Sequence, residues 1–220
     1  KDNHRSKYKV IITPPYTLIE SFSKHFKKKK INIGSQNCYH KDQFSSNTAA
    51  VSPYMLRSVG ANYTLVGHSD NRSEGDTDIV LKNKVKFALN NNLKVIFCIG
   101  ENKTQKNNKK TFNVLKKQLI STLDKKFNIH QIMVAYEPIW SIGTGSIPKN
   151  VELLNTTFFI KKILKEIFKS KKVPPVLYGG SVDGSNIDQF ITLPIIDGFL
   201  IGGASKSSKK FIDIIKNYYR

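Results

Sequence analysis

Short runs of β-branched and aromatic residues alternate with longer amphipathic runs along this chain. Seven of the short runs predict strands, at Tyr8–Thr13, Ile31–Gln36, Tyr63–Val66, Val95–Ile99, Ile132–Tyr136, Val176–Tyr178 and Gly198–Ile201. They are almost continuously apolar, which is typical of parallel strands buried on both faces. The amphipathic runs between them predict helices, including Ser52–Val59, Asp78–Asn91, Thr111–Phe127, Val151–Phe168 and Lys206–Tyr219. This alternation indicates an α/β fold built on a parallel sheet.

Two of the helical segments carry start and stop signals. The segment Ser52–Val59 opens on a serine suited to the N-cap, Pro53 suits the first helical position, and Gly60 follows as a terminator. Asn150 is placed to cap the segment Val151–Phe168, whose apolar residues recur at helical spacing.

The number of strand–helix units favours a barrel. A doubly wound sheet has about five or six strands, whereas a barrel has about eight. No dinucleotide-binding motif follows the first predicted strand, since Ile11–Tyr16 reads IITPPY. Residue 1 is Lys rather than Met, and one more unit of about 30 residues would bring the length to about 250. We therefore expect a single barrel domain over residues 1–220 that lacks its first β/α unit, with further residues upstream of Lys1.

The chain is strongly basic, with 36 Lys and Arg against 16 Asp and Glu and a formal net charge of +20. Such a charge attracts nucleic acids, anionic membranes and anionic substrates. Nearly all the basic residues are lysines, whereas base-specific contacts favour arginine, and no zinc-finger or aromatic–basic RNA-binding pattern occurs. No apolar run approaches the ~20 residues that a membrane helix needs. We expect a cytoplasmic protein with a solvated basic surface and no specific nucleic-acid or membrane partner.

The two cysteines, Cys38 and Cys98, each lie in an apolar stretch. They are too few for a disulfide framework, and a metal site would need close spacing with further His or Cys residues. Buried, reduced thiols are the expected state.

Two polar residues stand directly after predicted strands, where barrel enzymes carry their catalytic groups. His68 follows the strand YTLV within the segment VGHSDNR. Glu137 ends the strand IMVAY and is followed by Pro138, Trp140 and the glycine-flanked Gly143–Gly145. A carboxylate followed by a hydrophobic loop with rigid and flexible ends is typical of a base beneath a lid.

Paired glycines with a nearby serine follow the last two predicted strands, in LYGGSV (Leu177–Val182) and GFLIGGAS (Gly198–Ser205). Glycine lets backbone N–H groups converge on an anion, and a serine hydroxyl adds a donor. Loops after the last strands of a barrel are a frequent phosphate site, so these segments predict phosphate binding.

Together, GHSDNR, AYEPIWSIGTG, YGGSV and GFLIGGAS resemble the triosephosphate isomerase family in order and spacing, and QNCY and CIGE add to the match. The resemblance spans the chain from Thr13 to its end and implies the TIM (β/α)8 barrel class. It implies interconversion of D-glyceraldehyde 3-phosphate and dihydroxyacetone phosphate through an enediolate, in glycolysis and gluconeogenesis, without a metal or organic cofactor. By resemblance, Glu137 is the base and His68 polarises the carbonyl and moves protons between the two oxygens. The resemblance places the phosphate on Gly143, Ser181, Gly202 and Gly203.

The chain departs from the family pattern at two places near the reacting groups. The family's first strand carries a catalytic lysine in the motif NWKMN, which is absent from residues 1–220. Lys1, Lys7 and Lys9 lie too close to the next strand to replace it, so we expect the chain as given to be nearly inactive. Where the family has GHSERR, this chain has Asp70 in place of the glutamate. We carry Asp70 over as a catalytic residue with a shorter side chain.

The other departures concern the homodimer that the resemblance implies. The family loop FTGE, which docks on the partner subunit, corresponds here to NTAAV, with Thr48 retained and Ala50 in place of the glutamate. The arginine that this glutamate pairs with in the family is Asn71 here. Both partners of the ion pair are therefore missing, which is less harmful than the loss of one.

Two other functions compete with this interpretation. A different barrel enzyme, such as a phosphoribosyl isomerase, would keep the glycine pairs but has no need of GHS and AYEPIW together. A basic binding protein on a decayed isomerase would explain the missing lysine and the surface charge, but not the presence of His68, Glu137 and the lid. An isomerase assay separates the three.

Overall fold

The fold is described from a computed structural model that covers residues 8–41 and 47–219. Lys1 and Lys7, considered above as replacements for the family's lysine, lie outside these residues. The chain forms two compact units, the first made of residues 1–97 with 121–132 and the second of residues 98–120 with 133–220.

The first unit contains a parallel sheet in which strands follow chain order: β1 (Val10–Ile12), β2 (Ile31–Ser35), β3 (Tyr63–Val66) and β4 (Lys94–Ile99). The register pairs Val10 with Ile31, Gly34 with Tyr63 and Thr64 with Val95. Every residue of β3 is buried, as are the last five of β4. Their apolar character predicted this burial, and the strand bounds agree with the sequence to within two residues at each end.

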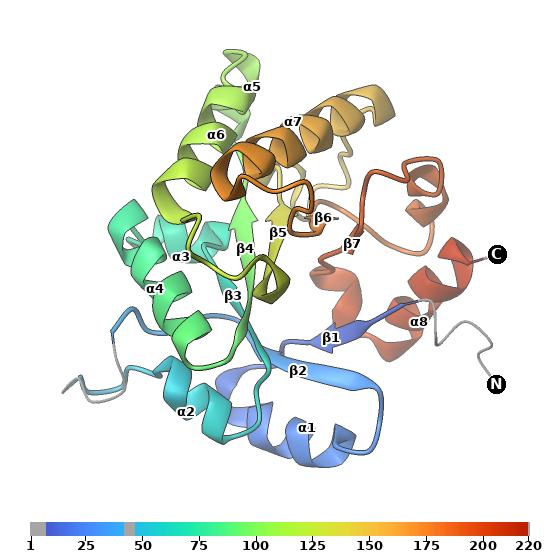
Figure 1. The fold of residues 1–220 in the computed structure, drawn as a ribbon. Coiled ribbons are helices and arrows are strands. Elements are labelled where there is room, and N and C mark those ends of the chain that lie inside the picture. Colours follow the sequence, from blue (N-terminus) through green and yellow to red (C-terminus); the bar gives the residue numbers. More distant parts are fainter. Residues whose placement is uncertain (1–7, 42–46, 220) are drawn as a thin grey trace. The chain divides into compact units, whose positions relative to one another are not determined.

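The helices of the first unit are α1 (Ile19–Phe26), α2 (Pro53–Ser58), α3 (Ser69–Ser73) and α4 (Asp78–Asn90), and α1 packs against β2 (Figure 1). The start of α2 confirms the prediction, since the Ser52 side chain accepts a hydrogen bond from Met55 N–H (3.2 Å) and Pro53 begins the helix. Gly60, beyond its end, has a φ of 97°, which favours glycine.

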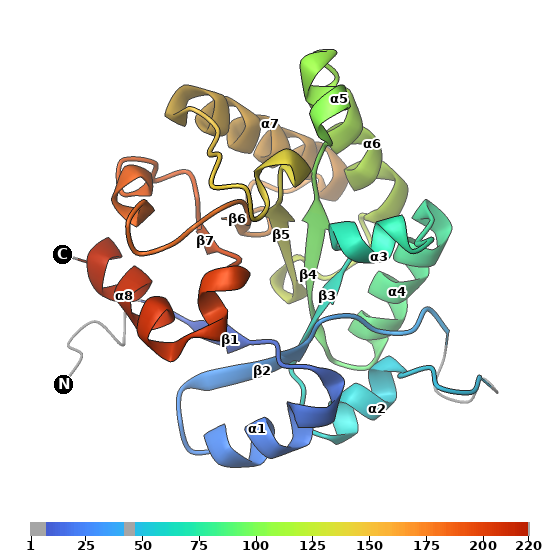
Figure 2. The same cartoon turned by 180° about the vertical axis from the view of Figure 1, so that it is seen from behind.

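The strands of the second unit, β5 (Ile132–Tyr136), β6 (Val176–Tyr178) and β7 (Gly198–Phe199), are also parallel and in chain order. Its helices are α5 (Lys103–Asn107), α6 (Thr111–Thr122), α7 (Asn150–Phe168) and α8 (Ser208–Tyr218). Helices α6 and α7 lie side by side in both views (Figures 1 and 2), and Phe112 stacks on Phe159 with ring centroids 4.6 Å apart.

Two helix boundaries in the second half of the chain differ from the prediction. Helix α6 ends at Thr122 rather than Phe127, and Asp124 Oδ1 accepts from Lys126 N–H (3.0 Å), a local bond that competes with helix continuation. Asn150 is the first helical residue of α7 and not its N-cap, so that prediction was wrong. The cap position is Lys149, which makes no capping bond, and the Asn150 amide donates to Gln189 O (3.4 Å) instead.

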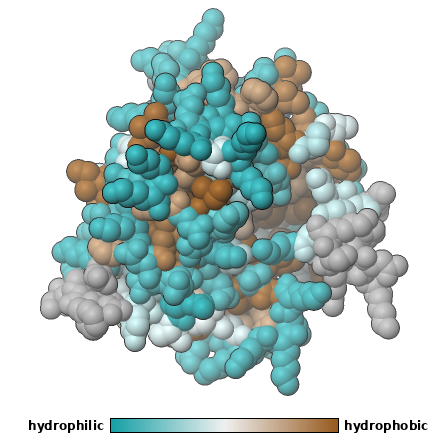
Figure 3. Space-filling model, in the orientation of Figure 1, coloured by the Kyte–Doolittle hydropathy of each residue, from teal (hydrophilic) through white to brown (hydrophobic). Residues whose placement is uncertain are grey.

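Hydrophilic side chains cover most of the face shown in Figure 3. Lys84, 4% exposed, is the only lysine buried within residues 8–41 and 47–219. The cysteines agree with the prediction, since Cys38 and Cys98 are both buried and free. In the part of the chain that the structure describes, none of the helices combines the length and apolar character needed to span a membrane.

Candidate active site

His68 lies between β3 and the short helix α3, at the helix N-cap position. Its Nδ1 accepts a hydrogen bond from the backbone N–H of Asp70 (3.3 Å), and the Asp70 carboxylate lies 3.4 Å from the same nitrogen. The backbone bond requires an unprotonated Nδ1, so in the neutral imidazole the proton sits on Nε2. The histidine side chain is 27% exposed and that of Asp70 is 80% exposed. The chain thus presents His68 as a partly accessible Nε2–H donor.

Arg72 fixes the short helix that follows His68. Its Nε donates to Gly67 O (2.7 Å), and its guanidinium lies over the Phe97 ring, 5.6 Å from the centroid. The end of the helix is held by the backbone bond from Asp76 N–H to Asn71 O (3.0 Å). The backbone on both sides of the histidine is therefore anchored within the first unit.

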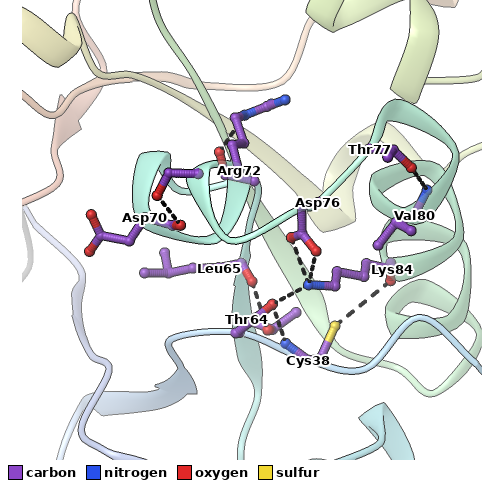
Figure 4. Close-up of polar contacts among 12 residues, drawn as sticks. Cys38, Thr64, Leu65, Asp70, Arg72, Asp76, Thr77, Val80 and Lys84 are labelled. Atoms are coloured by element: carbon purple, nitrogen blue, oxygen red, sulfur yellow. Dashed lines mark hydrogen bonds and ion pairs between the residues drawn. The ribbon is translucent and has the colours of Figure 1, made fainter.

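A buried ion pair lies beside this helix, toward α4 (Figure 4). The Lys84 ammonium, extending from α4, donates to both oxygens of Asp76 (2.8 and 2.7 Å) and to Asn37 Oδ1 (2.9 Å). The side chains of Lys84 and Asp76 are only 5% and 12% exposed. Beside them, the Cys38 thiol contacts Lys84 O, and burial raises its pKa to about 12. Lys84 thus joins the segment after β2 to the segment after α3.

Glu137 directly follows β5 in the second unit and is 5% exposed. Its backbone N–H donates to Ile99 O (2.8 Å). Two glycines make room for it: a Cβ on Gly100 would lie 1.8 Å from Glu137 O, and one on Gly179 would lie 2.6 Å from Glu137 Cγ. Close packing therefore sets the backbone of Glu137 at Gly100 and its side chain at Gly179.

Glu101, fully buried, anchors the residues on either side of Glu137. It accepts from Trp140 Nε1 (2.8 Å) and from Tyr136 Oη (3.3 Å to each oxygen). Burial raises the pKa of this carboxyl, while the bonds from Trp140 and Tyr136 act in the opposite direction. The Lys106 ammonium lies 3.4 Å from the centroid of the Trp140 ring and pairs with Glu152 (2.7 Å). The Trp140 indole, at the start of the predicted lid, is thus bonded through its N–H to Glu101 and covered by Lys106 over the ring.

The segment 139–146, which we call the lid, carries the predicted phosphate residue Gly143. Gly143 and Gly145 have φ values of 68° and 75°, in the left-handed region. Gly145 N–H donates to the Ser181 hydroxyl (3.1 Å), so the lid and the loop after β6 meet. Two of the residues predicted for phosphate binding therefore lie in segments that contact each other.

Gly202 and Gly203 follow β7, which pairs with β6, so their loop lies at the same edge as Ser181. A Cβ at either glycine would meet nothing within 4 Å. Packing within the chain does not require glycine at these positions, which leaves their backbone open to a ligand.

Nowhere in residues 8–41 or 47–219 do three His, Cys, Asp or Glu side chains gather as they would around a metal.

The sequence matches the family model described as "Triosephosphate isomerase" over residues 1–218. The chain belongs to the triosephosphate isomerase family. It is similar to the triosephosphate isomerases of Syntrophotalea carbinolica, at 36% identity over 94% of this chain and 84% of that protein, and of Dictyoglomus thermophilum, at 36% over 94% and 85%. The crystal structure of triosephosphate isomerase from Bartonella henselae matches with a TM-score of 0.89 and 28% identity, over 97% of this chain and 87% of that one. The predicted TIM-barrel class is confirmed.

Triosephosphate isomerase motifs account for the predicted residues but not for everything the structure brings together. Sequence reasoning missed Lys84 and Ser141, which are buried polar residues behind His68 and within the lid. Lys84 stands at helical spacing among the core residues Leu81, Val85 and Ala88, which was a usable signal. Nothing in the local sequence of Ser141 indicates its burial.

Proposed function

We propose that this member of the family interconverts D-glyceraldehyde 3-phosphate and dihydroxyacetone phosphate by using Glu137 as the base and His68 as the proton donor. Glu137 takes the proton from the carbon next to the carbonyl, and the electron pair of that C–H bond moves to form the enediolate. His68 Nε2–H donates to the oxygen on which charge develops, then moves a proton between the two oxygens. Glu137 returns its proton to the neighbouring carbon, which completes the aldose–ketose exchange of glycolysis and gluconeogenesis.

The observation that carries the proposal is the placement of Glu137. Glu137 directly follows a strand, with its side chain packed on Gly179, its backbone on Gly100 and the lid after it. A carboxylate buried in this way suits a base that works away from water. Exclusion of water matters because an exposed enediolate expels its phosphate. The open backbone at Gly202 and Gly203, with Gly143 and Ser181, supports binding of the substrate phosphate in the second unit. Asp70 is proposed to assist by holding His68 through its backbone N–H, which donates to Nδ1.

The test is Glu137→Gln in the full-length protein, since glutamine keeps the shape of the side chain but cannot accept a proton. We expect the isomerase rate to fall by at least ~10²–10⁴-fold, with the affinity for inorganic phosphate within about twofold of the parent. Deuterium incorporation from D2O into the product should fall in parallel, because it reports carbon deprotonation. Glu166→Gln, at an exposed position on α7, is the matched control and should leave both unchanged. A Glu137→Gln variant with more than a tenth of the parent rate would remove Glu137 from the role of base.

We propose that the chain forms a homodimer through the loop around Thr48. Ala50 and Met55 line a cavity of about 270 Å³ at this loop, and Met55 and Tyr54 are 50% and 53% exposed. Ala50→Glu with Asn71→Arg should restore an ion pair across the interface and lower the dimer dissociation constant, whereas either change alone should not. Sedimentation of the four forms measures this, and equal constants throughout would contradict it.

We propose a cytoplasmic location because the two cysteines form no disulfide. Cys38 and Cys98 are free and buried, which is typical of proteins from a reducing compartment.

A further inference from the structure

Ser141 is a fully buried serine within the lid. Its hydroxyl donates to Ser146 O (2.5 Å), lies 3.2 Å from Tyr178 Oη and accepts from Ser181 N–H (3.3 Å). Its carbonyl oxygen accepts from the Ser181 hydroxyl (2.8 Å). One residue therefore bonds to the far end of the lid, to the last residue of β6 and to the loop that follows β6.

The hydrogen-bonding capacity of the Ser141 hydroxyl is fully used. A serine hydroxyl has one proton to donate and two lone pairs to accept with. The shortest contact, to the carbonyl of Ser146, takes the proton, because a carbonyl cannot donate. Tyr178 Oη and Ser181 N–H are then the two donors. Burial raises the pKa of Tyr178 to about 12, so its hydroxyl keeps its proton at neutral pH and can donate.

The loop after β6 is shaped to admit this cluster. A Cβ on Gly180 would lie 2.1 Å from Tyr178 Oη and 2.7 Å from Ser141 Oγ. The Ser181 hydroxyl, which donates to Ser141 O, also accepts from Gly145 N–H (3.1 Å). Ser141 and Ser181 thus form a continuous set of bonds between the lid and the loop 179–181.

We propose that Ser141 is a positioning residue that fastens the lid to the loop 179–181 and so keeps the enediolate away from water. This inference rests on the proposed function. Ser141 acts through Ser181, which is itself proposed to hold the phosphate, and through Gly145, which bonds to Ser181. Its role is to keep the lid on the loop long enough for Glu137 to return its proton.

The chemistry supplies a readout specific to the lid. In an enediolate that is not enclosed, the electron pair of the C–O⁻ group can reform a carbonyl while the carbon–carbon double bond shifts and the C–O bond to phosphate breaks. Phosphate leaves with the bonding pair. The remaining enol takes a proton from water at carbon and gives up its O–H proton, which yields a dicarbonyl compound. No oxidant or reductant is needed. Inorganic phosphate released per isomerisation therefore measures failure of the lid.

The experiment is Ser141→Ala in the full-length protein. The variant loses three hydrogen bonds, and we expect KM for glyceraldehyde 3-phosphate to rise about tenfold and phosphate release per turnover to rise by at least as much. Tyr178→Phe removes a single partner of Ser141 and should move both quantities in the same direction by a smaller factor. It keeps the proposal testable if Ser141→Ala does not fold.

Ser35→Ala is the matched control, since Ser35 is equally buried, donates to Thr64 Oγ1 (2.8 Å) and belongs to the first unit. Ser35→Ala should lower the urea midpoint about as much as Ser141→Ala does, without changing the release of phosphate per turnover. A parent chain with no isomerase activity would overturn the proposed function itself. An active parent whose Ser141→Ala and Tyr178→Phe variants keep the parental KM and phosphate release would overturn only the role of Ser141.

Discussion

Each of the two units buries a charged side chain next to the backbone that carries a proposed catalytic residue. The two buried charges are stabilised in different ways. In the first unit, Lys84 meets the opposite charge of Asp76 in a short, doubly bonded pair. In the second unit, Glu101 is bonded by the neutral groups of Trp140 and Tyr136. The first arrangement cancels charge inside the cluster, whereas the second leaves a net charge in the interior.

This difference determines how each buried charge responds to substitution and to pH. We call the Lys84–Asp76 pair the first anchor and Glu101 the second anchor. A buried ion pair is sensitive to the loss of either partner, because the survivor is left charged and desolvated. A buried carboxylate with neutral donors is sensitive to pH, because protonation removes its charge without removing the side chain. We therefore expect substitution of Lys84 or Asp76 to disturb the backbone around His68. We expect the backbone around Glu137 to respond to pH through protonation of Glu101.

Breaking the ion pair should give the largest effect on stability. Lys84→Met keeps the length of the side chain but strands the Asp76 carboxylate, and we expect a loss of about 3–5 kcal/mol in the free energy of unfolding. Urea denaturation measures it. Lys82→Met, on the same helix, removes a half-exposed partner of Asp124 at 3.9 Å and should cost less than about 1 kcal/mol.

Adding Asp76→Asn to Lys84→Met should recover part of the loss, since the stranded charge is removed. A double-mutant cycle gives the coupling between the two residues. Additive losses would mean that Lys84 stabilises the chain through packing and not through its charge.

Neutralising the second anchor should have a smaller effect that depends on pH. Glu101→Gln keeps an acceptor for Trp140 and should cost about 1–2 kcal/mol at pH 5. The folded-state pKa of Glu101 is raised, so its contribution to stability is full below the ordinary glutamate pKa and is lost as pH rises through the raised value. The gap between parent and variant should therefore narrow from pH 4 to pH 8 in urea titrations. A gap that widens over this range would contradict the assigned cause.

The smallest effect uses Cys38 as a reporter of the first anchor. Because its pKa is raised to about 12, only about 10⁻⁴ of the thiol is ionised at pH 8, so iodoacetamide should modify it at least ~100-fold more slowly than in urea. Lys84→Met removes a charge that lowers the pKa of the thiol, so a faster reaction in the variant, detected by peptide mapping, would come from opening of the cluster. Equal rates in parent and variant would show that the thiol is shielded independently of Lys84.

The sequence was most informative where one local pattern sufficed. Apolar runs predicted every strand from β1 to β7, and His68 and Glu137 were found because they directly follow two of them. Lys84 was missed because a lysine in an amphipathic helix ordinarily faces water, and its partners Asp76 and Asn37 lie 8 and 47 residues away.

Ser141 and the α7 boundary were beyond local patterns for a related reason. Ser141 is buried because of contacts with residues 37 and 40 positions away. Asn150, a good capping residue by type, lies inside α7, where its amide bonds to Gln189, 39 positions along the chain. In each case a tertiary contact outweighs the local preference.

The close packing of Gly100 and Gly179 around Glu137 also limits how this chain can evolve. Even alanine at position 100 would place a methyl group 1.8 Å from the Glu137 carbonyl, a separation that no packed interior accommodates without moving the backbone. A single substitution at either glycine is therefore not neutral while Glu137 occupies its present position. A lineage that lost the Glu137 side chain would lose this restraint at position 179 but not at position 100, where the contact is with the backbone. A larger residue at 179 would therefore mark relatives that no longer need the glutamate.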